Sequence, residues 1–238
     1  MEMEKPKVIF EDESLLVLDK PTGMVVNRAQ TVKRETLQDW LEKKLKLQDR
    51  GVGGRAGIVH RLDKETSGIL IVAKTEQAFT NLQKQFKDRK IKKSYQALAH
   101  GKIGIKRGHI KAPVGRLPWN RERFGVLPGG RPAETDYEVI SYYKKDDQEF
   151  SLLNLFPKTG RTHQIRIHLK YLGYPIVSDN FYAGRKTSRK DRIWCQRLFL
   201  HAKSISFKHP ETNKTRKFES SLPADLSKAL QKLTLLKS

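Results

Sequence analysis

Three pairs of short apolar runs, each pair joined by a polar turn, constrain the fold of this chain more than any other feature of its sequence. In the first pair, Val8 to Phe10 and Leu15 to Leu18 flank Glu11 to Ser14. The other two pairs lie around polar turns at residues 144–148 and 209–213. Short apolar runs separated by turn residues predict β-hairpins. Because a hairpin joins antiparallel strands, we expect a largely antiparallel sheet.

Four segments between and after these hairpins have the spacing of helices. Thr36 and Thr75 each precede an amphipathic run and are candidate N-caps. A third helix is expected over about residues 162–172, and Pro223 can open a C-terminal one. Mixed helices and hairpins favour an α+β fold with flanking helices over a doubly wound parallel sheet.

The remaining segments complete this organisation. Ile69 to Ala73 predicts a buried strand, and residues 94–100 alternate as a strand that carries Tyr95. Residues 101–132 are rich in Gly, Pro and Arg, and we expect a long, partly extended basic insertion there. No repeat or linker divides the chain. We therefore expect residues 1–238 to form a single domain, which could be built as two lobes about a central basic cleft.

The charge of the chain points to a polyanionic partner. Lys and Arg number 48 against 26 Asp and Glu, which gives a formal net charge of +22 among 238 residues. An excess of this size favours nucleic acid, although an anionic membrane surface attracts the same charge.

The location of the chain is also constrained by its sequence. No apolar stretch approaches the roughly 18 to 20 residues that cross a bilayer. The opening residues 1–6 are too acidic for a signal or transit peptide. Cys195 is the only cysteine, so an internal disulfide and a thiolate zinc cluster are both excluded. We expect a cytoplasmic protein with no membrane partner.

One acidic residue stands out within the basic segments. The run from His60 to Gly68 reads HRLDKETSG and places Asp63 among Arg and Lys residues, in a loop between apolar segments. If Asp63 faces a cleft lined by Arg and Lys, those cations favour its ionised form. Asp63 is therefore a candidate nucleophile or general base acting on an anionic polymer.

Cofactor and metal signatures are weak. The glycine run at residues 51–56 fits GxGxxA, but a strand follows it rather than precedes it, which is the reverse of a dinucleotide site. His60, His163 and His168 lack the spacing and companions of a metal site, and a structural role is the favoured reading of each. We expect no cofactor and no metal.

Two further residues are candidates for the same site. Tyr95 is by default a half-buried strand residue, but a ring beside basic residues can stack on an unpaired base. Arg166 adjoins the apolar stripe formed by Ile165 and Leu169 at a helix start, where anions are also favoured. A partly buried arginine needs a carboxylate, and Asp63 is a candidate partner.

The run HRLDKETSG resembles the signature of the RluA family of RNA pseudouridine synthases. Similar blocks follow in family order around Tyr95, at residues 159–169, 173–182 and 198–210, and one precedes it at residues 15–26. The resemblance implies an α+β pseudouridine synthase fold with an RNA cleft. It also implies that Asp63 is the catalytic aspartate, that Tyr95 contacts the target base and that Arg166 pairs with the aspartate.

The resemblance further implies how RNA is held. Arg61 matches a residue implicated in displacing the target nucleotide from its stack. The other expected RNA-binding residues are His60, Lys64, Lys93, Arg161 and His163, and the basic segments at 84–93, 102–131 and 185–197 are candidates for phosphate contacts. Only about a dozen residues precede the first family block, so we expect the catalytic domain, without an N-terminal RNA-binding domain, to select the substrate.

The activity implied is isomerisation of uridine to pseudouridine, and we expect the chain to act as a monomer. Ribosomal RNA is the favoured substrate over transfer RNA. One alternative is a non-catalytic RNA-binding or ribosome-assembly factor on the same fold, which would tolerate loss of Asp63 but not reversal of its basic segments. A nucleic-acid glycosylase is a further alternative, and it would release free base.

Overall fold

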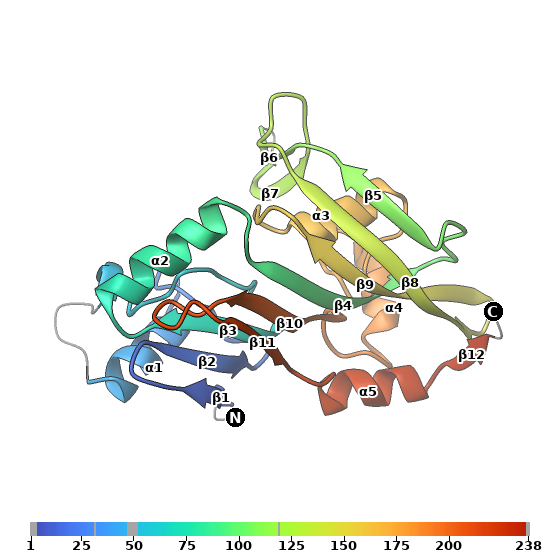
Figure 1. Ribbon diagram of the computed structural model, residues 1–238. Coiled ribbons are helices and arrows are strands. Elements are labelled where there is room, and N and C mark those ends of the chain that lie inside the picture. The colour runs from blue at the N-terminus through green and yellow to red at the C-terminus, as the bar shows by residue number, and fades with distance from the viewer. Residues whose placement is uncertain (1–3, 31, 47–51, 119, 237–238) are drawn as a thin grey trace. The chain divides into compact units, whose positions relative to one another are not determined.

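The structure is a computed structural model that describes residues 4–30, 32–46, 52–118 and 120–236, which group into two compact units (Figure 1). Unit 1 contains the chain up to Lys92 together with Ala202–Ser220. Unit 2 contains Lys93–His201 together with the chain from Ser221 onward. Each unit is therefore assembled from two separate segments of sequence.

Unit 1 is built around antiparallel strands. Strand β1 pairs with β2, β2 pairs with β3, β3 neighbours β10, and β10 pairs with β11. The elements of this unit are β1 (Lys7–Glu11), β2 (Leu15–Lys20), α1 (Leu37–Lys44), a 3-10 turn (Val52–Gly54), β3 (Ser67–Ala73), α2 (Glu76–Lys87), most of β10 (Leu200–Lys208) and β11 (Thr215–Glu219).

The core of unit 1 follows from the apolar pattern. Every residue of β3 is buried, and Leu82 of α2 packs in the same cluster as Val17 and Ile71. Phe207 from β10 joins this cluster although it lies more than a hundred residues further along the chain. Local apolar runs thus supply the strands, and a distant segment completes the sheet.

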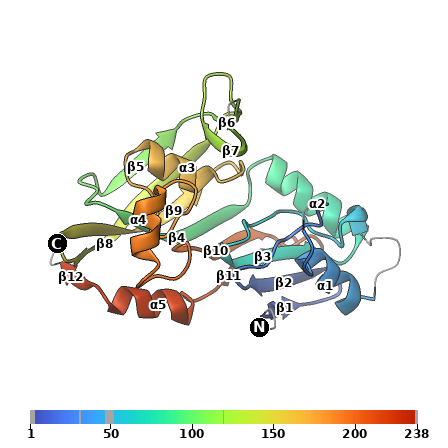
Figure 2. The ribbon, with the colours of Figure 1, turned by 180° about the vertical axis from the view of Figure 1, so that it is seen from behind.

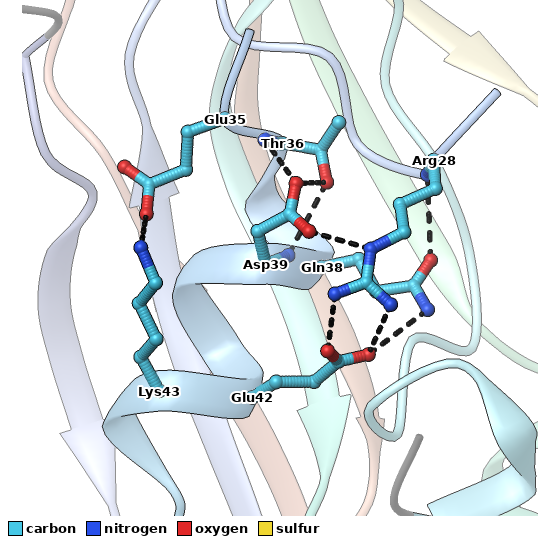
Figure 3. A network of polar contacts seen from close by, with 7 residues as sticks. All are labelled: Arg28, Glu35, Thr36, Gln38, Asp39, Glu42 and Lys43. Atoms are coloured by element: carbon cyan, nitrogen blue, oxygen red, sulfur yellow. Dashed lines mark hydrogen bonds and ion pairs between the residues drawn. The ribbon is translucent and has the colours of Figure 1, made fainter. Parts of the chain in front are cut away.

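Helix α1 begins with the cap expected from the sequence. Thr36 accepts a hydrogen bond from the Asp39 N–H (3.2 Å), and the Asp39 carboxylate accepts one from the Thr36 N–H (2.7 Å), which forms a capping box (Figure 3). Arg28 extends this network by donating to both Asp39 and Glu42, and Lys43 donates to Glu35. Burial raises the pKa of Asp39, but the hydrogen bonds from Thr36 and Arg28 outweigh that effect and leave it below its ordinary value.

Unit 2 is also antiparallel, in the order β4-β9-β8-β12, with β5 on the same edge of β8 as β12. Strands β6 and β7 form a separate ribbon. Figure 2 shows helix α4 in front of these strands. The elements are most of β4 (Lys92–His100), β5 (Arg107–Lys111), β6 (Val114–Leu117), β7 (Asn120–Val126), β8 (Glu134–Lys145), β9 (Gln148–Pro157), α3 (Gln164–Tyr171), α4 (Arg185–Asp191), α5 (Ala224–Gln231) and β12 (Thr234–Leu236).

These elements confirm the α+β class, the three hairpins and the four helices expected from the sequence. Residues 101–132, expected to be a partly extended basic insertion, contain the three strands β5, β6 and β7, which were not predicted individually. The side chains of β5 and β6 are mostly exposed or half-buried, with one buried side chain in each strand, so the apolar pattern that would reveal a strand is missing. Helix α4, with the sequence RKTSRKD, has no apolar residue at all. In the glycine run at 51–56, Gly51 lies outside the described residues.

Within the described residues, no helix is long and apolar enough to cross a membrane. The same residues contain no group of three or more His, Cys, Asp or Glu side chains arranged to hold a metal ion.

Candidate active site

Asp63 lies on a turn whose backbone is fixed to a second loop of unit 1. The Thr66 N–H donates to the Asp63 carbonyl (3.1 Å), which closes the turn. The Gly23 N–H donates to the Lys64 carbonyl (2.8 Å), and the Thr22 hydroxyl donates to the Glu65 carbonyl (2.9 Å). The Asp63 side chain is half-buried. This turn therefore holds its carboxylate on a backbone fixed at three consecutive carbonyls.

Lys20 connects the turn that carries Asp63 to the loop that follows β2. Its side chain is fully buried, and its ammonium group donates to the carbonyls of Pro21 (2.8 Å), Met24 (3.0 Å) and Lys64 (3.4 Å). A buried charge is costly unless polar groups surround it, and these carbonyl dipoles supply that surrounding. Lys20 was not identified from the sequence, where the available signal was a lysine that ends a strand opening with four apolar residues.

The motif continues directly into the buried strand β3. Gly68 has a φ of +112°, and a Cβ atom at this position would lie 2.3 Å from the Ala202 carbonyl oxygen of β10. Only glycine fits this approach. Close packing of β3 and β10 thus fixes the end of the segment that carries Asp63.

Three other residues of the HRLDKETSG run, Arg61, Lys64 and His60, differ in their exposure and contacts. The side chains of Arg61 and Lys64 are exposed, as RNA-binding residues should be. His60 instead accepts a hydrogen bond from the Ile71 N–H at Nε2 (2.9 Å), and its ring lies 4.8 Å from the Phe86 ring, centroid to centroid. These contacts give His60 a structural role within unit 1, and its role in binding RNA stays a prediction.

In unit 2, Arg166 forms a buried ion pair with Asp179. The guanidinium group is 3% exposed and the carboxylate 0%, and Nε and Nη2 donate to the two carboxylate oxygens at 2.8 Å each. Asp179 also accepts from the N–H groups of Phe181 (2.9 Å) and Tyr182 (3.1 Å). A bidentate pair of this kind fixes the plane of the guanidinium group.

Aromatic rings enclose the same arginine. The Arg166 guanidinium carbon lies 5.3 Å from the Phe181 ring centroid and 5.1 Å from that of Tyr182, within the range of cation–π attraction. The Tyr182 hydroxyl is hydrogen bonded to Nδ1 of His163 (2.9 Å). His163 has a left-handed backbone (φ 55°) and caps α3 without a side-chain hydrogen bond to the helix. Asp179, Phe181 and Tyr182 were not selected from sequence, although they fall in the family block at 173–182.

Tyr95 and Lys93 lie at the start of β4. Tyr95 is opposite Leu155 of β9 and packs at the margin of the unit 2 core. The Lys93 ammonium group lies 3.5 Å from the Thr159 carbonyl oxygen. Burial lowers the pKa of Lys93 from 10.5 to about 8, because the charged form is poorly solvated there. The Lys93 ammonium group is therefore poorly solvated, and groups whose pKa is perturbed in this way are common in functional sites.

A network around Gln164 positions Arg161. The Gln164 side-chain oxygen accepts from the Arg161 N–H (3.0 Å) and the Thr159 hydroxyl (2.7 Å). Its amide nitrogen donates to the Glu134 carbonyl and the Thr135 hydroxyl, both at 2.9 Å. The segment before α3 is therefore tied to β8, which leaves the Arg161 side chain at the surface with its Nε donating to the Pro132 carbonyl (3.1 Å).

The three candidate catalytic residues are divided between the units. Asp63 belongs to unit 1, and Tyr95 and Arg166 belong to unit 2. Arg166 is buried, more completely than expected, and Asp179 supplies the carboxylate that its burial requires. A pairing of Arg166 with Asp63 stays a prediction.

The fold of this chain is known from solved structures of other proteins. The structure is similar to human RNA Pseudouridylate Synthase Domain Containing 1, with a TM-score of 0.77, 26% sequence identity and coverage of 100% of this chain and 94% of that one. It shares its fold with human RNA Pseudouridylate Synthase Domain Containing 4, with a TM-score of 0.73 and 23% identity over 95% of this chain and 93% of the human one.

Sequence comparison narrows this class. The family model described as RNA pseudouridylate synthase matches residues 14–171. An uncharacterized RNA pseudouridine synthase of Chloroflexus aurantiacus is 42% identical over 217 residues, 90% of this chain and 65% of its own length. Ribosomal large subunit pseudouridine synthase D of Nitrosomonas europaea is 39% identical over 229 residues, 94% of this chain and 64% of its own length. The chain belongs to the RNA pseudouridine synthases of RluA type, and it spans about two thirds of the length of these relatives.

Proposed function

We propose that this chain isomerises uridine to pseudouridine in ribosomal RNA, with Asp63 as the catalytic carboxylate. The observation that carries the proposal is the family match over residues 14–171, which includes Asp63, Tyr95 and Arg166. Ribosomal RNA is the proposed substrate because several relatives 36–39% identical to this chain are named ribosomal large subunit pseudouridine synthase D.

In the proposed reaction the target uridine is extruded from its stack, at a cost of a few kcal/mol, and is held by the protein. The bond from ribose C1′ to uracil N1 breaks, the base turns, and C5 bonds to C1′. The proton on C5 is released, and N1 takes up a proton. The reaction is an isomerisation and consumes no redox equivalent.

The geometry of the candidate residues supports this assignment. Asp63 lies on a turn anchored through Gly23, Thr22 and Lys20, so its carboxylate can be presented without reorganisation of the backbone. Arg166 is fixed by Asp179, and such a preorganised cation can orient and stabilise a second carboxylate. We propose that Arg166 acts in this way on Asp63, and that Tyr95 stacks on the extruded base.

The RNA around the target is proposed to contact six further residues. Arg61 fills the place vacated by the extruded nucleotide. The other five are His60, Lys64, Lys93, Arg161 and His163. We further propose that the two units form one catalytic domain, which acts as a monomer in the cytoplasm.

Tritium release tests the proposed chemistry. The chain is incubated with cellular RNA labelled with tritium at uracil C5, and released tritium is measured. Release should occur with the parent chain and fall to background with Asp63→Asn, which keeps the size of the side chain but removes its charge. Unchanged release by Asp63→Asn, or no release from any RNA by the parent chain, would refute the assignment.

Two measurements separate this activity from its alternatives. RNA affinity of Asp63→Asn should equal that of the parent chain, because the change affects chemistry rather than backbone contacts. Free uracil and abasic sites among the products would identify a glycosylase instead. Mapping pseudouridines in ribosomal and transfer RNA from cells with and without the gene should reveal positions lost from ribosomal RNA alone.

A further inference from the structure

A basic groove in unit 1 lies outside the residues assigned to the candidate active site. It has a volume of about 650 Å³ and runs between the C-terminal half of α2 and the β10–β11 hairpin, which Figure 1 shows beside that helix. We call it the α2 groove. Its volume falls within the roughly 300–1,000 Å³ range of ligand pockets.

Ten of the twelve residues that line the α2 groove have cationic or neutral polar side chains. Asp88 is the one carboxylate among its described lining residues, and it pairs with Lys90 at 3.5 Å. The neutral polar lining comes from amide and hydroxyl side chains such as Asn81 and Thr215. The cationic residues are Lys84, Arg89, Lys90, Lys92 and Lys208, all exposed.

Hydrogen bonds connect the elements that form the walls of the groove. The buried Gln85 side chain bonds α2 to β10 in both directions, since its amide donates to the Lys208 carbonyl (2.7 Å) and its oxygen accepts from the Lys208 N–H (2.9 Å). The hairpin wall is fixed by His209, whose Nε2 lies 2.8 Å from an Asp12 carboxylate oxygen and whose N–H donates to the Lys214 carbonyl. A groove whose walls are joined by hydrogen bonds therefore presents exposed cationic groups.

This combination fits a phosphate backbone better than a base or a small nucleotide. The aromatic ring in the lining, Phe207, is 2% exposed and cannot stack on a base. Exposed lysines recognise phosphate as point charges without reading sequence. The chemistry of the groove therefore matches sugar–phosphate backbone, bound without base specificity.

We propose that the α2 groove binds the RNA backbone at a distance in sequence from the target uridine, as an anchoring surface for the substrate. This inference rests on the proposed function, because it takes RNA as the partner. The groove would raise the affinity for RNA and leave the chemical step unchanged. It would thereby help to select long structured RNA over short fragments.

The test uses a triple variant, Lys84→Gln, Lys90→Gln and Lys208→Gln, in the full chain. Its matched control is Lys5→Gln, Lys7→Gln and Lys46→Gln, which removes three exposed lysines of unit 1 that do not line the groove. Binding of a structured ribosomal RNA fragment is measured between 50 and 500 mM salt, and tritium release is measured at saturating and limiting RNA. Thermal melting confirms that each variant is folded.

Loss of three phosphate contacts should reduce the slope of log affinity against log salt by about 2 to 3 and weaken binding roughly 100-fold at 0.1 M salt. Tritium release at saturating RNA should be unchanged, while release at limiting RNA should fall in parallel with affinity. The control triple variant should lose much less affinity. Equal losses in both variants, or an unchanged salt slope in the groove variant, would overturn the inference.

Failure of the groove proposal can be distinguished from failure of the proposed catalytic function. If no RNA releases tritium but the groove variant still loses affinity and salt slope, the anchoring surface stands and the catalytic assignment fails. If the triple variant does not fold, the single variant Lys208→Gln is used, with an expected change in slope of about 0.7 to 0.9. An acidic protein that binds the groove more tightly than RNA does would also overturn the inference.

Discussion

Replacement of Lys93 by Met should stabilise the chain at neutral pH and weaken its binding of RNA. Burial at the start of β4 lowers the pKa of the Lys93 ammonium group from 10.5 to about 8. At pH 7 the group is charged in both the folded and unfolded chain, so folding must move a charge into a poorly solvated place. Methionine fills a similar volume and carries no charge.

The size and sign of the effect follow from the two pKa values. A lowering from 10.5 to about 8 corresponds to about 3 kcal/mol at 1.36 kcal/mol per unit, and partial exposure makes this an upper limit. Below pH 8 the lysine is charged in both states, and Lys93→Met should gain about 1 to 3 kcal/mol. Between pH 8 and 10.5 the unfolded chain binds one proton more than the folded chain, so the parent chain becomes more stable as pH rises. Above pH 10.5 the difference should be lost.

Urea unfolding at pH 7, 8, 9 and 10 measures this difference, because other titrating groups contribute equally to both chains. The control is Lys92→Met, which removes an exposed lysine from the same strand and should change stability by no more than about 0.5 kcal/mol. RNA affinity at pH 7 should fall for Lys93→Met. A Lys93→Met variant no more stable than its parent at pH 7, or one whose gain does not shrink towards pH 10, would refute the reasoning.

Three further predictions concern buried polar groups and close packing. Asp179→Asn breaks a buried bidentate ion pair and should cost about 3 kcal/mol or more in urea unfolding, whereas Glu138→Gln breaks an exposed pair and should cost less than about 1 kcal/mol; similar losses in the two variants would contradict the assignment. Burial lowers the pKa of His168, so its neutral form is favoured in the folded chain, and stability that is complete above about pH 6.5 should decline as the pH falls below it. His168→Gln should make the decline between pH 7 and 5 shallower, and an equal decline in both chains would argue against burial as its cause. Gly68→Ala places a Cβ atom 2.3 Å from the Ala202 carbonyl oxygen and should lower the free energy of unfolding by at least about 2 kcal/mol, measured by thermal melting; an unchanged melting temperature would show that β3 and β10 can separate there.

Elements that depend on neighbouring residues were predictable from the sequence. The β8–β9 hairpin follows from two apolar runs around a polar turn, and Thr36 and Thr75 cap their helices as their spacing indicates. In both cases the determining contacts lie within a few residues of one another. Strands β5 and β6 were not predicted individually, because each is short and has a single buried side chain, so no apolar alternation marks it.

In the candidate site too, residues that depend on local spacing were predictable and those that depend on distant segments were not. Arg166 was identified because it adjoins a helical apolar stripe, and its burial bears this out. Asp179 could not be identified by spacing, since it lies 13 residues beyond Arg166 and outside the helix. Lys20 and the lowered pKa of Lys93 depend on packing by distant segments, which periodicity does not record. The family resemblance named the chemistry, but it did not specify which neighbours fix each group.

The assembly of each unit from two segments bears on how the chain reaches its native state during synthesis. Unit 1 needs Ile205 and Phe207 for its core, so β3 has no native neighbour on one side until more than 130 residues after it have been made. Unit 2 in turn needs β12, within the last residues described, to cover one end of the β8 edge. A nascent chain therefore carries an apolar strand with an open edge until β10 has been made, and such an edge favours aggregation. For the same reason, no single cut in the gene yields either unit as an independent fragment.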